Sequence, residues 1–541
     1  MVRQPSSIRF HARTRMFRQS FILIATALSA AFASTQVSVT TYHYDNYRTG
    51  WNSQETALTV AAVGSSSFGV LGKTVLDDQV DAQPLVVPRV TITAGKFKNT
   101  VHSVVYVATE NNSVYAIDTN TGQALLKVNF GPPVVRPLGC AKNNPDVGIN
   151  STPVIDLSSN LLYLVSYTQE TTGPAYHVHA LALGSLVDVV PPQLVAASQR
   201  LSDGSTYEFN AAVQRQRPAL LLANGSVYAG FGSFCDFAPT ESRGWLLGWQ
   251  TGTLTPLAGN ELMNTQASSP KNFYLTPIWM SGYGPAADDS GNVLFVTGNS
   301  ESTTYDGLTN LQESVLKVSG DLGEVLDLFT PTNVDDLDDG DLDFGSGGVM
   351  VLPDQPGATP HLAVAAGKIG TMFLMNEDNL GGFSPQGNNV LGTYNIGPCW
   401  CGPSYFVDPT DGAARVVSSG ANQMEVWKLA TSPGPGLTRV SESGDLTTRA
   451  NGFFTSVSTN GTGTAANPII WAVTRPVRAL TTVSLYAFSP DSGGATMKQL
   501  FMGNAGAWVS NGSNPNLVPV VANGRVFVAS YKELVILGLH K

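Results

Sequence analysis

The sequence predicts an all-β fold, an eight-bladed β-propeller of antiparallel four-stranded blades that is closed by an N-terminal strand. The first observation is the composition of the 541-residue chain, which has 54 glycines and only 13% charged residues, against about 25% in an average globular protein. Long amphipathic helical patterns are missing. Such a chain favours many short strands joined by tight turns.

The second observation is a repeat. A dipeptide that ends in proline precedes an apolar run at six places: Gln83-Pro84, Thr152-Pro153, Arg217-Pro218, Thr276-Pro277, Gly402-Pro403 and Val518-Pro519. Successive members are separated by about 60 residues or about twice that distance, a spacing typical of repeat architectures. Gly347-Gly348 and Thr455-Ser456 lie within the two intervals that are about twice as long, one in each. The chain therefore contains eight similar units.

The third observation is the anatomy of a unit. In the third one, the apolar runs 217–222, 226–232 and 244–249 are separated by turns, the first of which contains Asn224-Gly225. Asn-Gly between two apolar runs is a strong hairpin signal, and it recurs at Asn523-Gly524. One small sheet cannot bury both of its faces, so neighbouring units must stack around an axis. The strand-like run 68–76 is expected to close the ring by joining the short last unit.

The first residues predict export. Residues 1–33 contain five arginines and no acid, with an apolar run at 21–31 and a small-x-small site at Ala31-Phe32-Ala33, as in a signal peptide. The run is shorter than the roughly 20 apolar residues of a membrane span. Whether translation starts at Met1 or Met16 stays open. We expect a signal peptide at 1–33, an N-terminal extension at 34–65, a propeller at 66–541, and a secreted or periplasmic location.

The net charge of the chain argues against a nucleic-acid partner. Removal of residues 1–33 leaves 25 basic and 40 acidic residues, a formal net charge of −15. Nucleic-acid binding depends on neutralising phosphates, so this composition argues against it. We expect a monomer without a membrane span that binds a small molecule on the propeller axis.

Four cysteines remain, and in an exported protein they indicate disulfides. Cys140 and Cys235 lie in neighbouring units and are able to pair. Cys399 and Cys401 are one residue apart, so a bond between them would be strained. The sequence leaves the connectivity open.

The first unit carries the phrase Ala116-Ile-Asp118-Thr-Asn-Thr121-Gly122, with Leu126 four residues later. It resembles the Ala-x-Asp-x-x-Thr-Gly-x-x-x-Trp repeat of the quinoprotein dehydrogenases, and the resemblance covers about residues 66–541. The resemblance implies pyrroloquinoline quinone (PQQ) and Ca²⁺ on the propeller axis. Calcium polarises the quinone carbonyl, an aspartate takes the substrate's hydroxyl proton, and hydride passes to the quinone. Such a site needs oxygen ligands for calcium, a carboxylate base and a cation near the quinone oxygens.

Four segments resemble the family's site in the same order along the chain. Phe234-Cys235-Asp236 and Gly298-Asn299 resemble its metal-binding segments, and Leu342-Asp343-Phe344 its base aspartate. Gly367-Lys368 resembles the turn that carries its quinone-facing cation. The resemblance thus implies calcium ligands at Asp236, Asn299 and Asp343, with Asp343 also the catalytic base and Lys368 a cofactor-binding residue.

The sequence also departs from the family. Gly139-Cys140 replaces an adjacent cysteine pair, and the quinone-stacking tryptophan falls near Gly282 or Tyr283, so that Trp279 substitutes only if the strand shifts. No arginine for the quinone carboxylates stands near Val147. No Cys-x-x-Cys-His occurs, so no covalently attached haem is expected.

Each candidate has a structural alternative. Arg217, which opens an inner strand, is either an anion-facing cofactor residue or the partner of a nearby acid. Trp400 either floors a pocket or packs between blades. The alternative for Asp236 and Asn299 is that they are only turn residues at blade tips. The alternative for Lys368 is that it is only a hairpin residue.

Two functions therefore stay open. One is a secreted quinoprotein-like dehydrogenase of alcohols or sugars. The other is a non-catalytic propeller whose channel or loops bind a ligand, a glycan or a partner protein.

Overall fold

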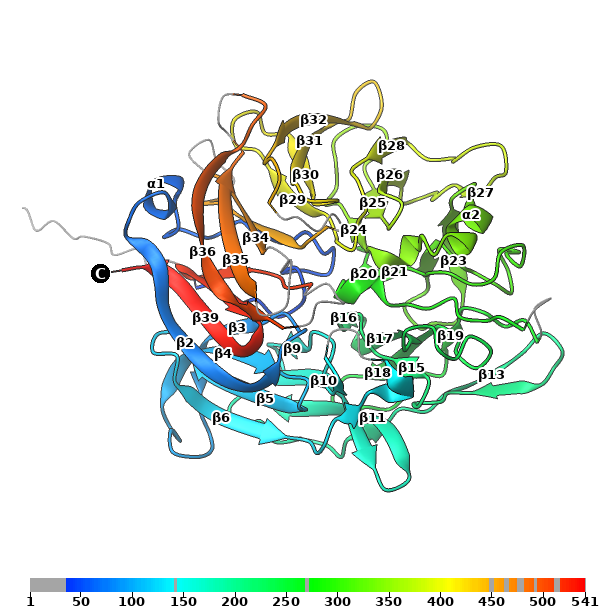
Figure 1. Ribbon diagram of the computed structural model, residues 1–541, viewed down its shortest axis with the longest axis horizontal. Helices are drawn as coiled ribbons and strands as arrows, with labels where there is room; N and C mark the ends of the chain where they lie inside the picture. The colour runs from blue at the N-terminus through cyan, green and yellow to red at the C-terminus, as the bar shows by residue number, and fades with distance from the viewer. Residues whose placement is uncertain are drawn as a thin grey trace, which may run out of the picture. The chain divides into compact units, whose positions relative to one another are not determined.

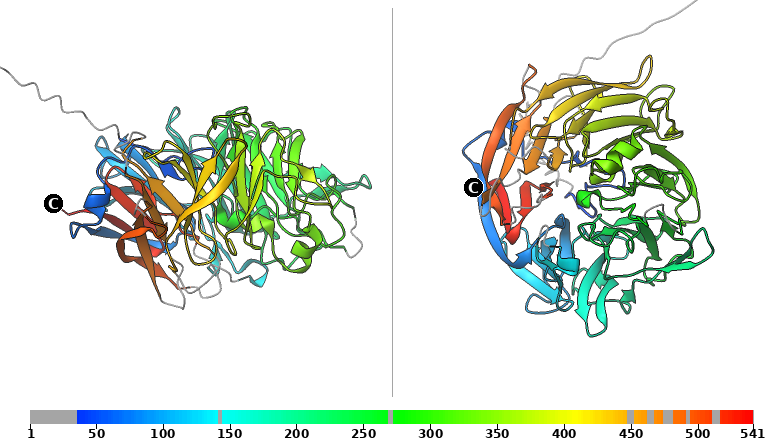
Figure 2. Two further views of the ribbon diagram at one scale, coloured as in Figure 1. Left: turned by 90° about the horizontal axis from the view of Figure 1, so that it is seen from above. Right: turned by 45° about the vertical axis from the view of Figure 1, so that its right-hand side comes forward.

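The computed structural model describes residues 36–140, 144–267, 272–446, 452–461, 467–473, 481–490, 494–509 and 516–540. The expected signal peptide, 1–33, lies outside these residues. Gln36–Lys541 form one compact unit, in which eight mostly antiparallel sheets stand around an axis (Figure 1; Figure 2, right). The predicted eight-bladed β-propeller is therefore confirmed.

The first four blades follow one another along the chain. Blade 1 contains β3 (Leu85–Thr91), β4 (Val101–Ala108), β5 (Ser113–Asp118) and β6 (Ala124–Asn129). Blade 2 contains β9 (Val154–Asp156), β10 (Leu161–Glu170), β11 (Gly173–Ala182) and β12 (Gln193–Leu194). Blade 3 contains β15 (Gln214–Arg215), β16 (Leu221–Ala223), β17 (Ser226–Ser233), β18 (Trp245–Gln250) and β19 (Glu261–Leu262). Blade 4 contains β20 (Ala286–Ala287), β21 (Val293–Val296), β22 (Val315–Val318), β23 (Val325–Thr330) and β27 (Gly382–Phe383).

The other four blades complete the ring. Blade 5 contains β24 (Val349–Val351), β25 (Leu362–Ala366), β26 (Thr371–Asn376) and β28 (Gly392–Asn395). Blade 6 contains β29 (Ser404–Val407), β30 (Ala414–Ser418), β31 (Glu425–Ala430) and β32 (Gly436–Glu442). Blade 7 contains β1 (Trp51–Asn52), β33 (Thr455–Ser458), β34 (Ile469–Val473), β35 (Thr481–Ser489) and β36 (Lys498–Trp508). Blade 8 contains β37 (Val520–Ala522), β38 (Arg525–Ala529), β39 (Tyr531–Leu539) and β2 (Phe68–Gln79).

Smaller elements connect the blades. Two short strand pairs are β7 (Val134–Val135) with β8 (Asp146–Val147), and β13 (Ser198–Arg200) with β14 (Thr206–Glu208). The helices are α1 (Val60–Val63), α2 (Val334–Asp339) and the 3₁₀ turns η1 (Pro137–Gly139), η2 (Met280–Gly282) and η3 (Phe344–Ser346). Within the described ranges, no helix has the length and apolar character needed to cross a bilayer.

The ring closes with strands from both ends of the chain. β2 pairs antiparallel with β39, from Phe68 opposite Leu539 to Gln79 opposite Tyr531. In Figure 1 the blue β2 accordingly lies beside the red β39. Closure by an N-terminal strand, predicted from the run 68–76, is confirmed, and β2 extends three residues further.

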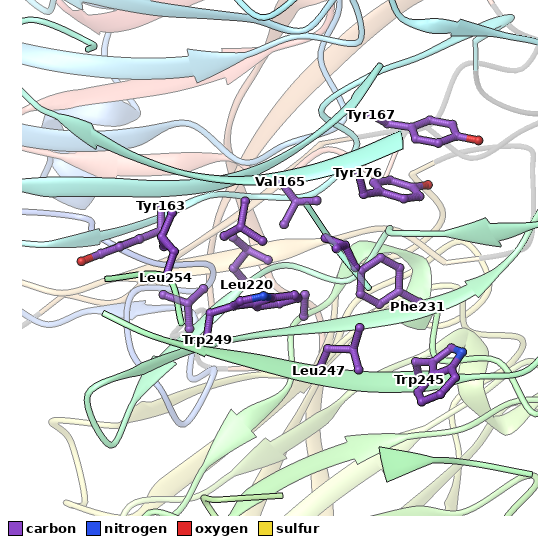
Figure 3. Close-up of a cluster of buried hydrophobic side chains, with 14 of the residues drawn as sticks. Tyr163, Val165, Tyr167, Tyr176, Leu220, Phe231, Trp245, Leu247, Trp249 and Leu254 are labelled. Atoms are coloured by element: carbon purple, nitrogen blue, oxygen red, sulfur yellow. The ribbon is translucent and has the colours of Figure 1, made fainter. Parts of the chain in front are cut away.

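The hydrophobic core is divided among the blade interfaces. The described residues form eight clusters of buried apolar side chains, and each cluster joins two neighbouring blades, including blades 8 and 1. Between blades 2 and 3, Tyr176 lies edge-on to Phe231 with ring centroids 5.6 Å apart (Figure 3). Because both faces of a blade are covered, all six residues of β5 are buried. Exposed and covered residues alternate in the outermost strand β6.

The Asp118-x-x-Thr121-Gly122 phrase of the first unit has a structural role. Asp118 Oδ1 accepts hydrogen bonds from the backbone N–H groups of Asn120 (2.9 Å) and Thr121 (2.8 Å). Gly122 has a φ of +70°, a left-handed conformation that glycine adopts without strain. The phrase therefore forms the turn between β5 and β6.

The N-terminal segment 39–52, here called the hub, forms hydrogen bonds with all eight blades. Its bonds follow the blades in order: Val39 pairs with Val86, the Thr40 carbonyl accepts from Ile155, and the Gly50 carbonyl accepts from Val457. The residues contacted in blades 1 to 8 are Val86, Ile155, Leu222, Ala287, Val351, Tyr405, Val457 and Val521. All of them belong to innermost strands, whose inward edges otherwise expose unpaired backbone groups.

Aromatic rings fill the space inside the hub. The buried His43 ring stacks on Tyr42 at 4.5 Å, and Tyr283 meets Tyr42 edge-on at 5.2 Å. Burial lowers the pKa of His43 to about 3, so the ring is neutral at ordinary pH. A Cβ on Gly348 or Gly402 would lie 2.0 Å from the Tyr283 ring. These two glycines of the repeat therefore allow inner strands to approach the axis.

Arg48 joins the hub to several elements. The residue is fully buried, and its guanidinium donates to four backbone carbonyls, those of Tyr42, Asp45, Leu220 and Pro285, and to the Thr41 hydroxyl. Every guanidinium nitrogen thus has a partner.

We expect Arg48→Met to lower the free energy of unfolding by at least about 3 kcal/mol, because several buried carbonyls lose their donor. Urea unfolding monitored by tryptophan fluorescence measures the loss. Arg200→Met is the matched control: Arg200 is exposed and makes one bond, to the Gly204 carbonyl, so we expect a change within about 0.5 kcal/mol. Equal effects of the two substitutions would contradict the role of the hub.

Candidate functional site at the axial mouth

One end of the propeller axis collects the segments that the sequence singled out. Within a blade, the start of the first strand and the end of the second lie at the same end because the two are antiparallel. Arg217, Trp279, Asp343 and Trp400 precede β16, β20, β24 and β29, the inner strands of blades 3 to 6, whereas Asp236, Asn299 and Lys368 follow the neighbouring strands β17, β21 and β25. We call this end the axial mouth.

The turn before β20 differs from expectation. Thr276-Pro277 was expected to open the inner strand of blade 4, but that strand begins at Ala286. Leu275, Thr276, Met280 and Ser281 all have positive φ values. The chain therefore makes a compact turn, which brings Trp279 to the mouth before the strand starts.

Asp343 lies at the centre of the group and is 3% exposed. Its Oδ2 accepts a hydrogen bond from Trp279 Nε1 at 3.0 Å, and its Oδ1 lies 3.1 Å from Lys368 Nζ. Lys368 Nζ also lies 2.8 Å from Asp341 Oδ1. The carboxylate of Asp343 is thus held from two sides by groups on different blades.

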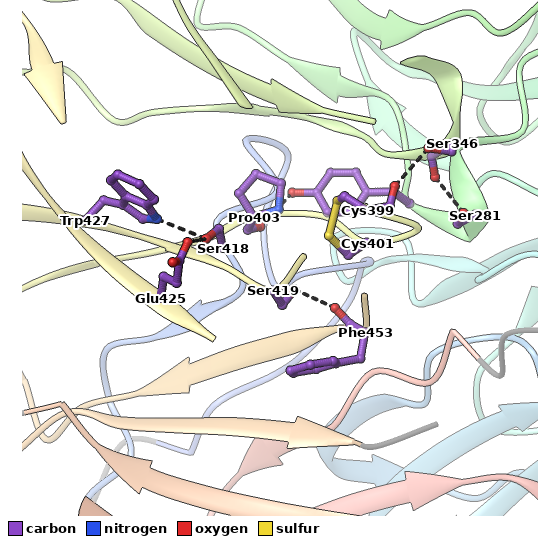
Figure 4. Close-up of a disulfide and its surroundings, with 11 residues drawn as sticks. Ser281, Ser346, Cys399, Cys401, Pro403, Ser418, Ser419, Glu425, Trp427 and Phe453 are labelled. Atoms are coloured by element: carbon purple, nitrogen blue, oxygen red, sulfur yellow. Dashed lines mark hydrogen bonds between the residues drawn. A yellow bond between two sulfur atoms is a disulfide. The ribbon is translucent and has the colours of Figure 1, made fainter. Parts of the chain in front are cut away.

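Trp400 also faces Lys368. The Lys368 ammonium lies 5.6 Å from the ring centroids of both Trp279 and Trp400, within cation–π range. Trp400 is half-buried and is the residue between Cys399 and Cys401, which form a disulfide (Figure 4). The Ser346 hydroxyl donates to the Cys399 carbonyl at 2.8 Å, so the disulfide ring is tied to η3, directly after Asp343. Lys368, Trp279, Trp400 and Asp343 are therefore brought together.

The other disulfide, Cys140–Cys235, joins the segment before blade 2 to the end of β17. Each of the four cysteines is thus bonded, which resolves the connectivity that the sequence left open. The Cys399–Cys401 disulfide forms although only one residue separates the two cysteines.

Asn299 and Asp236 border this group in different ways. Asn299 is 7% exposed, and its Oδ1 has no hydrogen-bond partner within the described part of the chain. Asp236 is exposed and accepts from the Ser233 hydroxyl at 2.5 Å. Its charge nevertheless raises the pKa of Asp343, so the two carboxylates are electrostatic neighbours.

Glu313 is a buried acid that the sequence analysis did not single out. It accepts from the backbone N–H of Phe344 through Oε2, whereas its Oε1 is buried without a partner among the described residues. Burial, followed by the charge of Asp343, raises its pKa well above the usual value. Glu313 lies two residues before β22 and belongs to no motif, so no sequence signal marks it.

The charges at the mouth affect one another. Burial raises the pKa of Asp343 to about 6, although Lys368 lowers it. Burial alone would lower the pKa of Lys368, but the carboxylates of Asp343 and Asp341 raise it. Lys368 therefore stays charged and favours the ionised form of Asp343.

The Arg217 guanidinium packs against Gly282, near which the resemblance places the quinone-stacking tryptophan. Gly282 has a φ of +89°, and a Cβ there would lie 2.2 Å from Arg217 Nη1. A side chain at this left-handed position would have to displace the Arg217 guanidinium, which lies close to where the resemblance expects an aromatic ring. Arg217 Nη1 donates to the Asn150 carbonyl at 3.0 Å rather than to an acid.

The donor chemistry of the mouth fits a calcium ion. The buried Oδ1 of Asn299 and Oε1 of Glu313 lack partners in the described ranges, and calcium prefers such oxygen donors. In those ranges, no cluster of three or more His, Cys, Asp or Glu side chains is arranged to hold a metal. A calcium site here would therefore depend on the Asn299 amide and on water as well as on carboxylates.

No family model matches the sequence, and no curated protein matches it. Solved structures do. The quinohemoprotein alcohol dehydrogenase from Comamonas testosteroni superposes with a TM-score of 0.56 at 13% identity, over 93% of this chain and 80% of that one. A europium-containing methanol dehydrogenase gives 0.55 at 10% identity, over 93% and 98%. The chain has the quinoprotein dehydrogenase fold.

At such low identity the likeness concerns the quinoprotein fold alone. BamB from Moraxella catarrhalis gives a TM-score of 0.45 at 11% identity, over 87% of this chain and 98% of that one. Function must therefore be argued from the side chains at the mouth.

We expect Lys368→Met to lower the free energy of unfolding by about 3 kcal/mol, because it leaves the buried Asp343 carboxylate without its cation. Adding Asp343→Asn should recover part of this loss, since the uncompensated charge is then absent. Chemical unfolding of the two single variants and the double variant forms a mutant cycle. Strictly additive losses would show that the two side chains do not interact.

Proposed function

We propose that the chain is an exported quinoprotein-like dehydrogenase that uses PQQ and Ca²⁺ to oxidise an alcohol or a sugar at the axial mouth. The observation that carries the proposal is the buried Asp343 carboxylate, held between Lys368 Nζ and Trp279 Nε1. A buried carboxylate with a pKa near 6 is suited to accept a proton close to neutral pH. Two disulfides support export to an oxidising compartment.

Each residue has a defined task in this proposal. Asp343 takes the hydroxyl proton of the substrate, and Trp279 fixes the orientation of its carboxylate. Asn299, Asp236 and Asp343 would hold the calcium ion, with the buried Oε1 of Glu313 as a further oxygen donor.

The remaining residues bind the cofactor. Lys368 would face the quinone oxygens, Trp279 and Trp400 would contact the quinone ring, and Arg217 would face an anionic group. When bound, the quinone supplies the hydride acceptor. The half-buried indoles restrict water around the Lys368 ammonium, which strengthens its electrostatic effect.

The full mature chain should bind PQQ at micromolar concentration in a calcium-dependent manner, measured by absorbance titration with and without EDTA. Dye-linked assays over a panel of alcohols and sugars then identify the substrate. Asp343→Asn should retain quinone binding and lower kcat by at least about 100-fold, and Asn299→Ala should weaken calcium binding by about tenfold or more.

Asp336→Asn is the control, since Asp336 is an exposed acid on α2 and its removal should leave both measurements unchanged. Absence of quinone binding would rule out the dehydrogenase.

A second candidate is a non-catalytic propeller whose mouth binds a ligand, a glycan or a partner protein. Two observations favour it: the Arg217 guanidinium packs against Gly282, near the expected stacking position, and Lys368 is already paired with Asp343. This function predicts ligand binding at the mouth with no dye reduction for any alcohol or sugar.

A further inference from the structure

The end of the propeller opposite the axial mouth contains a largely buried lysine that faces two acids. Lys317 Nζ lies 2.8 Å from Asp288 Oδ2 and 3.2 Å from Glu377 Oε1. The Glu377 carbonyl also accepts from Lys317 Nζ at 3.4 Å. The side chains of Lys317, Asp288 and Glu377 are 13%, 5% and 7% exposed, so bulk water screens their charges only weakly.

These three residues connect two blades. Asp288 directly follows β20 and Lys317 belongs to β22, both in blade 4, whereas Glu377 directly follows β26 in blade 5. The first and third strands of a blade end away from the mouth, because neighbouring strands are antiparallel. We call Lys317, Asp288 and Glu377 the interblade latch.

A different contact joins the same two blades at the mouth. Trp279, before β20, donates to Asp343, before β24, at 3.0 Å. Between the two ends lies an apolar cluster to which blade 4 contributes Val296 and blade 5 contributes Val349. The interface between blades 4 and 5 is thus tied at each end by a buried carboxylate.

The charges of the latch are not balanced. Two carboxylates face one ammonium, so one negative charge is left over when both acids are ionised. At Asp288 the side-chain amide and the backbone N–H of Asn292 also donate, each at 2.7 Å. The Glu377 carboxylate shares Lys317 with Asp288. Glu377 is therefore the acid of the latch that gains most from binding a proton.

The pKa shifts agree with this assignment. Burial raises the pKa of Glu377 to about 7, although Lys317 lowers it. Burial alone would raise the pKa of Asp288, but hydrogen bonds from Lys317 and Asn292 hold it below its usual value. Burial would lower the pKa of Lys317, but the two carboxylates raise it. Near neutral pH, Glu377 changes its charge while Asp288 and Lys317 stay ionised.

The surroundings of the latch are also acidic. His361 Nδ1 lies 2.9 Å from the Asp378 carboxylate, and the Asp327 carboxylate accepts from the Leu380 N–H at 2.7 Å. The other charged or titratable groups facing the latch come from the hub, from the turn after β20 and from the segment between β24 and β25: Tyr47, Asp289 and Asp354. Ionised Glu377 therefore adds a negative charge to a negative environment.

We infer that the interblade latch is a pH-sensitive switch: protonation of Glu377 tightens the contact between blades 4 and 5, and its deprotonation loosens this contact. The switch titrates the end of the interface that lies away from the mouth. It requires neither a ligand nor any redox activity, so it is independent of the dehydrogenase proposal.

The direction of the effect follows from linkage. The pKa of Glu377 is about 7 in the folded chain, against the ordinary value of 4.5. Below about pH 4.5 the acid is protonated in both states. As the pH rises from about 4.5 to about 7, the unfolded chain releases this proton first, so the folded state loses stability.

Scanning calorimetry of the full mature chain between about pH 5 and pH 8 tests the inference. Other buried acids also lower the melting temperature as the pH rises, so each variant is compared with the wild type. Glu377→Gln should remove about 2 °C or more of this fall. Glu324→Gln is the matched control: Glu324 is an exposed acid in the turn between β22 and β23, and its removal should leave the pH profile unchanged.

Two further variants distinguish a titrating latch from a purely structural contact. Asp288→Asn leaves Lys317 to Glu377 alone and should also flatten the pH profile. Lys317→Gln removes the cation that favours ionised Glu377 and should make the profile steeper. A purely structural contact would instead lower the melting temperature equally at every pH, which would overturn the inference. If Lys317→Gln does not fold, the two acid variants still decide.

Hydrogen exchange measured by mass spectrometry locates the change. After correction for the intrinsic pH dependence of exchange, peptides that contain β20, β22 and β26 should lose protection between about pH 6 and pH 8 in the wild type. The same peptides should keep their protection in Glu377→Gln. Equal protection at both pH values in the wild type, or the full wild-type pH dependence in Glu377→Gln, would overturn the inference.

Discussion

The structure depends on the hydrogen bonds between one N-terminal segment and the inner strands of all eight blades. A ring of eight blades leaves unpaired backbone groups along its inner edges, and each such buried group is costly if it stays unpaired. Residues 39–52 satisfy these groups in blade order, from Val39 at blade 1 to Asn52 at blade 8. The hub therefore sets the spacing of the blades and fills the axis with aromatic rings.

This constraint also shapes the mouth. The hub and Tyr283 fill the axis, and the chain just before Tyr283 forms a turn with positive φ values, which contains Trp279, instead of a strand. That turn links two groups of side chains: Trp279 bonds to Asp343, and Gly282 packs on Arg217. The mouth thus places a buried acid–base pair across one turn from Arg217.

Much of the fold was predictable because its signals are local. The proline phrases mark the inner strands of most blades, Asn224-Gly225 forms a turn, and 68–76 joins the last blade. The convergence of Trp279, Asp343, Lys368 and Trp400 follows from the blade register, because each lies beside the start of a first strand or the end of a second. Their predicted binding roles stay predictions.

Other features were not predictable from one sequence. The hub bonds join residues hundreds of positions apart, and no periodic pattern marks the phrase around Arg48. The turn before β20 depends on positive φ values at residues other than glycine, which their identities do not suggest. Glu313 has no motif, so its importance follows only from its burial and from the partner that its Oε1 lacks among the described residues.

The central claim is that the axial mouth binds a small polar molecule. A crystal structure of the protein grown with PQQ and calcium tests it most directly. We predict ligand density that contacts Lys368 and Arg217, with a metal beside Asn299 Oδ1. A mouth that contains only ordered water, bonded to those same atoms at saturating ligand concentration, would contradict the claim.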